Sequence, residues 1–274
     1  MKPLFSVIIP SLNEEKFLPR LLSDLQNQKL KNFEIIVIDA CSSDNTIKNI
    51  LRFKQTLPLR IFKAKRHNVS FSRNFGAEKA KGEYLVFLDA DVQIYSSFIK
   101  NLNKAVNNNK GLLFIPRTVP DEKDQQMEVI FRIVSFLTEM SQYVGKPFSN
   151  GGSMVVEKNF FNRIGRFDEK LFLAEDHNLI QRAQLWGVRA KFLNHLKIKF
   201  SLRRMKKEGK LEAFYKYLVA TAYILIKGDI KKEIFDYQMG GAEYKKLKNK
   251  ISFTDNMNNY SKIIKEFFSK LLSS

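Results

Sequence analysis

Apolar runs alternate with helix-like segments through the first half of the chain. The apolar runs, which predict buried strands, cover residues 5–10, 33–38, 59–62, 84–88 and 112–115. The segments between them predict helices over residues 14–28, 43–53, 70–81 and 97–107. Strands this apolar, separated by helices, predict an α/β fold in which a mostly parallel sheet is covered on both faces.

The second half of the chain is less regular. Residues 127–144 predict a long, mostly apolar helix, residues 153–156 a short strand and residues 175–186 a further helix. Beyond His195 the chain becomes basic, and we expect helices there. The longest uncharged apolar run, residues 217–226, is far shorter than the roughly 20 residues of a membrane-spanning helix, so we expect none.

The charge of the chain narrows its choice of partner. Lys and Arg number 47 against 28 Asp and Glu, which gives a net charge of +19 and favours an anionic partner. Nucleic acid, a phospholipid surface and a phosphorylated small molecule all fit. Zinc-finger spacing and the Lys/Arg-Gly-Phe signature of RNA-binding domains are both missing, so nucleic acid is disfavoured. The single cysteine, Cys41, excludes a disulfide framework and favours a cytoplasmic location.

Polar side chains follow three of the predicted strands. Residues 11–14 follow the first strand, Asp39 the second, and Asp89 and Asp91 the fourth. Open parallel sheets bind ligands at the carboxyl ends of their strands. Two carboxylates on one tight turn can hold a single Mg²⁺ or Mn²⁺ and leave positions for substrate phosphates. The alternative is a pair of solvated turn residues, which is less favoured directly after a buried strand.

Charged pairs elsewhere have both a structural and a functional interpretation. Glu175 and Asp176, in the first turn of a predicted helix, complement its dipole or provide a general base for a hydroxyl. Arg73 is either a surface residue or a cation near a base or phosphate. Arg203 and Arg204 form a solvated basic face or neutralise a diphosphate by bidentate hydrogen bonds.

Five motifs, in this order, resemble family 2 of the nucleotide-sugar glycosyltransferases. They read FSVIIPSLNEE, EIIVIDACSSDNT, NVSFSRNFGAEKAKGEYLVFLDADV, SNGGSMVVEKNFFNRIGRFDE and AEDHNLIQRAQLWG. The resemblance runs from about Phe5 to Lys210. It implies a GT-A fold, with a Rossmann-like sheet, as a catalytic domain over residues 1–210. Residues 211–274 would then form a helical C-terminal segment.

The resemblance also implies roles for single residues. Pro10, Asn13 and Glu14 would line the nucleotide pocket. Asp39 would bind the base, usually uracil in this family, and Arg73 would also contact the nucleotide. The remaining donor-binding residues would be Asp89 on the ribose or sugar, Gly151 and Gly152 beside the sugar and acceptor, Glu175, and Arg203 and Arg204 near the diphosphate. Asp91 would hold Mn²⁺ or Mg²⁺, and Asp176 would be the catalytic base.

The implied reaction is one inverting displacement, in which a sugar passes from a nucleoside diphosphate, chiefly UDP, to an acceptor hydroxyl. The QxxRW motif of processive synthases is missing at Gln184–Trp186, which favours a single transfer. Ala40-Cys41 stands where the family usually has acidic residues or glycine, which loosens the assignment of the base. A nucleotidyltransferase usually needs a glycine-rich and basic phosphate loop, which SLNEE is not. A scaffold with an inactive transferase fold is disfavoured because the four aspartates with implied roles are all present, namely Asp39, Asp89, Asp91 and Asp176.

The C-terminal segment carries an amphipathic basic pattern. Its apolar positions, at helical spacing, are Tyr260, Ile263, Ile264, Phe267, Phe268, Leu271 and Leu272, and lysines lie between them. Such a helix could lie on the anionic inner face of a membrane, which would suit a lipid-linked acceptor. Packing on the catalytic domain or on a second copy is the alternative.

Overall fold

The computed structural model describes residues 2–109, 111–143, 147–149 and 153–209, with 216, 219–220, 223–224 and 228–231. These residues form two compact units. The first holds residues 2–169 and Glu175–Ser201, and the second holds Lys170–Ala174 and the described residues from Leu202 onward. Gly151, Gly152 and the amphipathic pattern of residues 260–272 lie outside the described residues.

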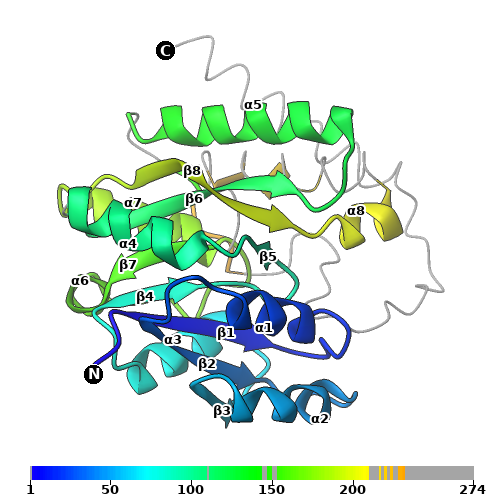
Figure 1. The fold of residues 1–274 in the computed structure, drawn as a ribbon. Helices are drawn as coiled ribbons and strands as arrows, with labels where there is room; N and C mark the ends of the chain where they lie inside the picture. Colours follow the sequence, from blue (N-terminus) through cyan, green and yellow to red (C-terminus); the bar gives the residue numbers. More distant parts are fainter. Residues whose placement is uncertain are drawn as a thin grey trace. The chain divides into compact units, whose positions relative to one another are not determined.

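The first unit is built on one eight-stranded sheet with the order β3-β2-β1-β4-β7-β6-β8-β5 (Figure 1). The strands are β1 (Phe5–Ser11), β2 (Phe33–Asp39), β3 (Leu59–Lys63), β4 (Tyr84–Phe87), β5 (Gln93–Ile94), β6 (Leu113–Pro120), β7 (Met154–Glu157) and β8 (Lys191–Phe200). Strands β3, β2, β1 and β4 run parallel, as do β6 and β8, whereas β7 is antiparallel to both its neighbours and β5 to β8. The predicted α/β fold with a mostly parallel sheet is confirmed.

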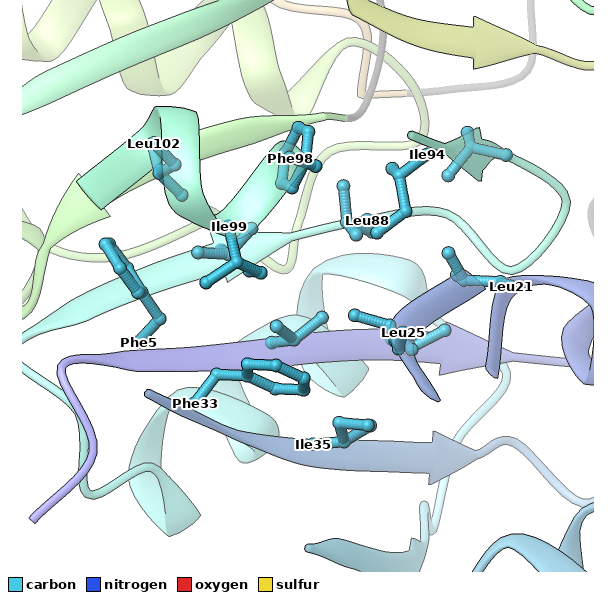
Figure 2. Packing of buried hydrophobic residues seen from close by; sticks show 14 of the residues in the cluster. Phe5, Leu21, Leu25, Phe33, Ile35, Leu88, Ile94, Phe98, Ile99 and Leu102 are labelled. Atoms are coloured by element: carbon cyan, nitrogen blue, oxygen red, sulfur yellow. The ribbon is translucent and has the colours of Figure 1, made fainter. Parts of the chain in front are cut away.

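Helices cover both faces of this sheet. They are α1 (Leu18–Gln26), α2 (Thr46–Ile50), a 3₁₀ turn (Leu51–Gln55), α3 (Val69–Lys79), α4 (Phe98–Asn109), α5 (Gln125–Ser141), α6 (Lys158–Arg163) and α7 (Glu175–Leu185). Side chains alternate along a strand, so Val7 and Ile9 pack with α1 and α4 while Ile8 packs with α3. Figure 2 shows Leu21 and Leu25 of α1 and Phe98, Ile99 and Leu102 of α4 over the strand residues of the first core.

One predicted element is wrong. Residues 195–200 belong to strand β8 and not to a helix. The register between β6 and β8 moves from Pro116↔Leu193 to Arg117↔Lys197, so β8 carries extra residues at this point. This irregularity leaves the buried Leu193 and Leu196 three positions apart, a spacing that imitates a helix. Pairing with β6 makes these residues a strand, and the sequence pattern does not reveal that pairing.

The second unit has its own small core. It contains α8 (Arg203–Glu208) and an antiparallel bridge between Leu173 and Ile230. Buried side chains of the described part are Val219, Ala220, Ile224 and Ile230, against which Phe172, Leu173, Ala174 and Tyr223 pack. Across the described part of the chain, each helix is too short or too polar to cross a membrane.

Candidate nucleotide-sugar site

Two loops at the carboxyl ends of β1 and β2 are joined by hydrogen bonds. The Asn13 N–H donates to Ser42 Oγ (2.8 Å), and the Ser43 N–H donates back to Asn13 Oδ1 (2.7 Å). The Glu14 N–H donates to Thr46 Oγ1 (2.7 Å). Asn13 has a φ of 55°, a left-handed conformation that asparagine tolerates better than most residues. The predicted pocket residues Asn13 and Glu14 therefore have fixed backbones.

Asp39 lies beside these loops, at the end of β2. The β1–β2 register pairs Ser11 with Asp39 and the neighbouring Pro10 with Ile38. The Asp39 carboxylate accepts hydrogen bonds from the Ser42 N–H (3.0 Å) and from Ser42 Oγ. The structure thus brings Pro10, Asn13, Glu14 and Asp39 to one edge of the sheet, as the sequence predicted. Their contacts with a nucleotide stay predictions.

Helix α3 carries Arg73 to the same edge. The side chain of Asn68 begins the helix by accepting a hydrogen bond from the Phe71 N–H (2.7 Å). One turn after Arg73, a Cβ added to Gly76 would lie 2.4 Å from Ile8 Cγ2 of β1. Because glycine has no side chain, α3 can lie this close to the sheet, and Arg73 is buried as a result.

Arg73 joins two of the predicted acidic residues. Its Nη2 lies 2.8 Å from Asp89 Oδ1, and its Nη1 bonds to Glu175 Oε1. Its guanidinium lies over the Phe167 ring at 5.4 Å. Burial opposes the charge of Arg73, but the carboxylates of Asp89, Glu175 and Asp176 outweigh it and raise the pKa of Arg73. The side chain therefore carries its charge at every accessible pH.

Glu175 and Asp176 occupy the first turn of α7, and both are buried. Burial raises the pKa of Glu175, although Arg73 opposes this shift. Asp176 behaves in the opposite way. Burial alone would raise its pKa, but His177 and Arg73 lower it to about 2, with His177 Nδ1 lying 3.0 Å from Asp176 Oδ1. Asp176 is thus an ionised carboxylate at neutral pH.

Sequence reasoning missed two contributors to this cluster. His177 stacks on the ring of Phe148, with centroids 6.1 Å apart, and so holds the partner of Asp176 in place. Asn74, next to Arg73, has a buried amide that bonds to the backbone of Phe167 in both directions, at 2.9 and 3.1 Å. A buried asparagine inside a helix indicates that its amide bonds to another part of the chain. The sequence does not reveal the partner, Phe167, because it lies far from Asn74 along the chain.

Among the residues that the structure describes, Asp91 is the predicted residue whose side chain fits a divalent cation. The described residues contain no group of three or more His, Cys, Asp or Glu side chains that could enclose a metal. Asp91 is half-buried just after β4, while Asp89 is engaged by Arg73. A single carboxylate suits Mg²⁺ or Mn²⁺ when substrate phosphates and water supply the other ligands. Asp91 as the metal residue therefore stays a prediction that the donor set allows.

The two arginines that we predicted to bind the diphosphate belong to the second unit. Arg203 and Arg204 are half-buried residues of α8, in the second unit. Their role stays a prediction, as does that of Gly151 and Gly152.

Two solved structures that share this fold are GT-A glycosyltransferases. The crystal structure of Staphylococcus aureus TarS residues 1–349 with UDP-GlcNAc has a TM-score of 0.58 and 23% identity, and the likeness covers 73% of this chain and 58% of that chain. A mannosyltransferase from Pyrobaculum calidifontis, in complex with GDP-Man and Mn²⁺, has a TM-score of 0.65 and 20% identity, over 83% of this chain and 63% of that one. The predicted GT-A fold is thereby confirmed.

The chain belongs to glycosyl transferase family 2, whose family model matches residues 6–165. Poly(ribitol-phosphate) beta-N-acetylglucosaminyltransferase TarS of S. aureus is 32% identical over 35% of this chain and 18% of its own length. GalNAc(5)-diNAcBac-PP-undecaprenol beta-1,3-glucosyltransferase of Campylobacter jejuni is 30% identical over 62% of this chain and 56% of its own. The matches therefore span less than two thirds of these relatives.

Proposed function

We propose that this chain is an inverting glycosyltransferase that moves a sugar from a nucleoside diphosphate to an acceptor hydroxyl. The observation that carries the proposal is the buried cluster in which Arg73 joins Asp89, beyond β4, to the turn of α7 that holds Asp176. The family and the GT-A fold support the reaction class. The cluster supplies an ionised carboxylate beside the strand ends where such folds bind ligands.

Asp176 is the proposed general base. Its low pKa keeps it ionised, so it can accept the proton of the acceptor hydroxyl while that oxygen attacks the anomeric carbon. The new bond joins the acceptor oxygen to the anomeric carbon, and the bond from this carbon to the diphosphate oxygen breaks. The nucleoside diphosphate leaves with the electron pair. Attack from the face opposite the leaving group inverts the anomeric configuration.

Asp39 and the joined loops after β1 and β2 form the proposed nucleotide pocket, in which Asp39 accepts a hydrogen bond from the base. Uridine is the proposed base, and the TarS complex with UDP-GlcNAc supports it. The mannosyltransferase complex with GDP-Man is the reason to test guanosine donors as well. Asp89, on the far side of Arg73 from α7, is the proposed contact to the ribose or sugar.

Asp91 is the proposed residue for Mn²⁺ or Mg²⁺. A bound cation supplies stabilisation of the negative charge that develops on the departing diphosphate. The mannosyltransferase complex with Mn²⁺ supports a divalent ion in a protein of this fold. The basic residues Arg203 and Arg204 are proposed to contribute to the same charge stabilisation.

The proposed acceptor is linked to a lipid, so the transfer would take place at a membrane surface. The name of the Campylobacter relative includes an undecaprenol diphosphate acceptor, which supports this idea. Helix α5 adds support, because it exposes a row of apolar side chains at helical spacing, namely Val129, Ile133, Phe136, Leu137 and Met140. Flotation with anionic vesicles tests the proposal, and it fails if the full chain stays with the unbound fraction.

The experiment for the reaction itself is a donor screen. Thermal stability is measured with UDP, GDP and their sugars, with and without Mn²⁺ or Mg²⁺, and then donor hydrolysis and transfer are measured with the donor that binds. We expect a metal-dependent shift that Asp91→Ala removes, and a loss of turnover in Asp176→Asn with donor binding retained. Near-normal transfer by Asp176→Asn would overturn the assignment of the base.

A further inference from the structure

Arg73 occupies a position that a direct contact to the nucleotide does not explain. Its side chain is only 2% exposed, and it bridges Asp89, just beyond β4, and Glu175 on α7. We propose that Arg73 is a positioning residue: it ties Asp89 to the first turn of α7 and so fixes where the Asp176 carboxylate lies. The inference rests on the proposed role of Asp176 and deepens it, because it says what holds the base beside the donor.

The geometry of the guanidinium suits this role. Its planar fork can bond to two carboxylates at once, which the ammonium of lysine cannot do with the same fixed directions. The ring of Phe167 closes a third side at 5.4 Å. If Arg73 turned toward a nucleotide, Glu175 would remain as a buried carboxylate without its partner, which is strongly unfavourable. The residue is therefore held in place by its surroundings.

A frame of hydrogen bonds between side chains and backbone groups surrounds Arg73. Asn74 brackets Phe167, and Asn68 donates to the Glu169 carbonyl (3.1 Å), so α3 holds residues 167–169. On the other side, Arg182 of α7 donates to the carbonyls of Ile164 and Arg166. Helix α3, residues 164–169 and α7 thus form one connected body, and the Arg73–Asp89 pair attaches it to the end of β4.

Glu175 provides a way to break one arm of this link alone. Burial raises the pKa of Glu175 and Arg73 opposes it, so the ionised carboxylate depends on its arginine partner. Glu175→Gln keeps the size of the side chain and leaves the Arg73–Asp89 pair in place. Glu78→Gln is a matched control on α3, because Glu78 makes a half-exposed pair with Arg166 at 2.7 Å. Arg66→Lys, at a largely exposed pair with Glu169, is the control for Arg73→Lys.

Hydrogen exchange tests the link without any need for activity. The relevant amides are those of residues 179–182, whose N–H groups bond to carbonyls of the first turn of α7. We expect Glu175→Gln and Arg73→Lys to speed their exchange by about tenfold, the effect of a local loosening. Glu78→Gln and Arg66→Lys should leave it unchanged. Unchanged exchange in Glu175→Gln overturns the inference.

Kinetics separate positioning from donor contact. We expect Glu175→Gln to lower kcat by roughly 10- to 100-fold, as a small displacement of a catalytic group does, while the Kd for the nucleoside diphosphate with Mn²⁺ stays within about threefold of wild type. The double variant Arg73→Lys/Glu175→Gln should be no slower than Arg73→Lys, because both changes break one link. A weaker Kd with kcat unchanged would make these residues donor contacts and overturn the inference. A wild type without turnover on any donor would count against the proposed function, while hydrogen exchange would still decide on the link.

Discussion

The ionised carboxylate of Asp176 is predicted to contribute to the free energy of unfolding in a way that depends on pH. Its pKa is lowered from 3.8 to about 2 by His177 and Arg73, against the effect of burial. An acid whose pKa is lower in the folded state stabilises the fold above its unfolded pKa, and this stabilisation is lost as pH falls through the folded pKa. At about 1.4 kcal/mol for each pKa unit, the ionised Asp176 contributes roughly 2 to 3 kcal/mol at pH 7. By the same linkage, roughly half of this remains at pH 3.

The assay is urea unfolding of wild type and Asp176→Asn at pH 7 and pH 3. We expect the variant to be less stable by roughly 2 to 3 kcal/mol at pH 7 and by about half as much at pH 3. Glu83→Gln, an exposed change of carboxylate to amide, is the control and should have little effect. Equal losses at both pH values would refute the reasoning, because the effect would then come from packing and not from charge.

Three further predictions follow from single positions. Gly76→Ala should destabilise the protein by about 1 kcal/mol in urea unfolding, because the clash with Ile8 outweighs the helix propensity gained; an unchanged midpoint would contradict this. Asp39→Asn should weaken UDP binding about tenfold in calorimetry and leave the melting temperature of the free protein near wild type, whereas equal UDP affinity would remove Asp39 from the base pocket. Phe136→Glu, on the exposed face of α5, should lower flotation with anionic vesicles, and Glu139→Gln should not.

Much of the fold follows from the sequence because its strands are unusually apolar. β1, β2 and β4 are almost entirely buried, so continuous runs such as those ending at Pro10 and Ile38 mark their positions directly. Strand β8 was predicted wrongly, and the short strand β5 was not predicted. The pairing of β8 with β6 changes register between Pro116 and Arg117, where β8 carries extra residues, and the buried residues of β8 take a helix-like spacing. Local pattern predicts elements well where burial is uniform and fails where pairing disturbs the alternation.

The site was predictable in its parts but not in its connections. Topology alone places Asp39 and Asp89 at one edge of the sheet, since they end or follow parallel strands. Arg73 and Glu175 are 102 residues apart in the sequence, so no local spacing predicts their contact. An arginine on a helix ordinarily suggests a solvated side chain, but Arg73 is buried in the structure, on a helix that packs closely on the sheet at Gly76.

The pKa values of two neighbouring acids at the start of α7 shift in opposite directions, which fits the two different roles proposed for them. A buried carboxylate is costly, and Glu175 accepts that cost, as its raised pKa indicates. If the first turn served only to complement the helix dipole, an exposed acid would do so without burial. The burial instead places Glu175 on Arg73, and Arg73 and His177 together keep Asp176 ionised. In the proposed arrangement, Glu175 anchors the first turn of α7 to Arg73, and Asp176 keeps an unprotonated oxygen that can accept the proton of the acceptor hydroxyl.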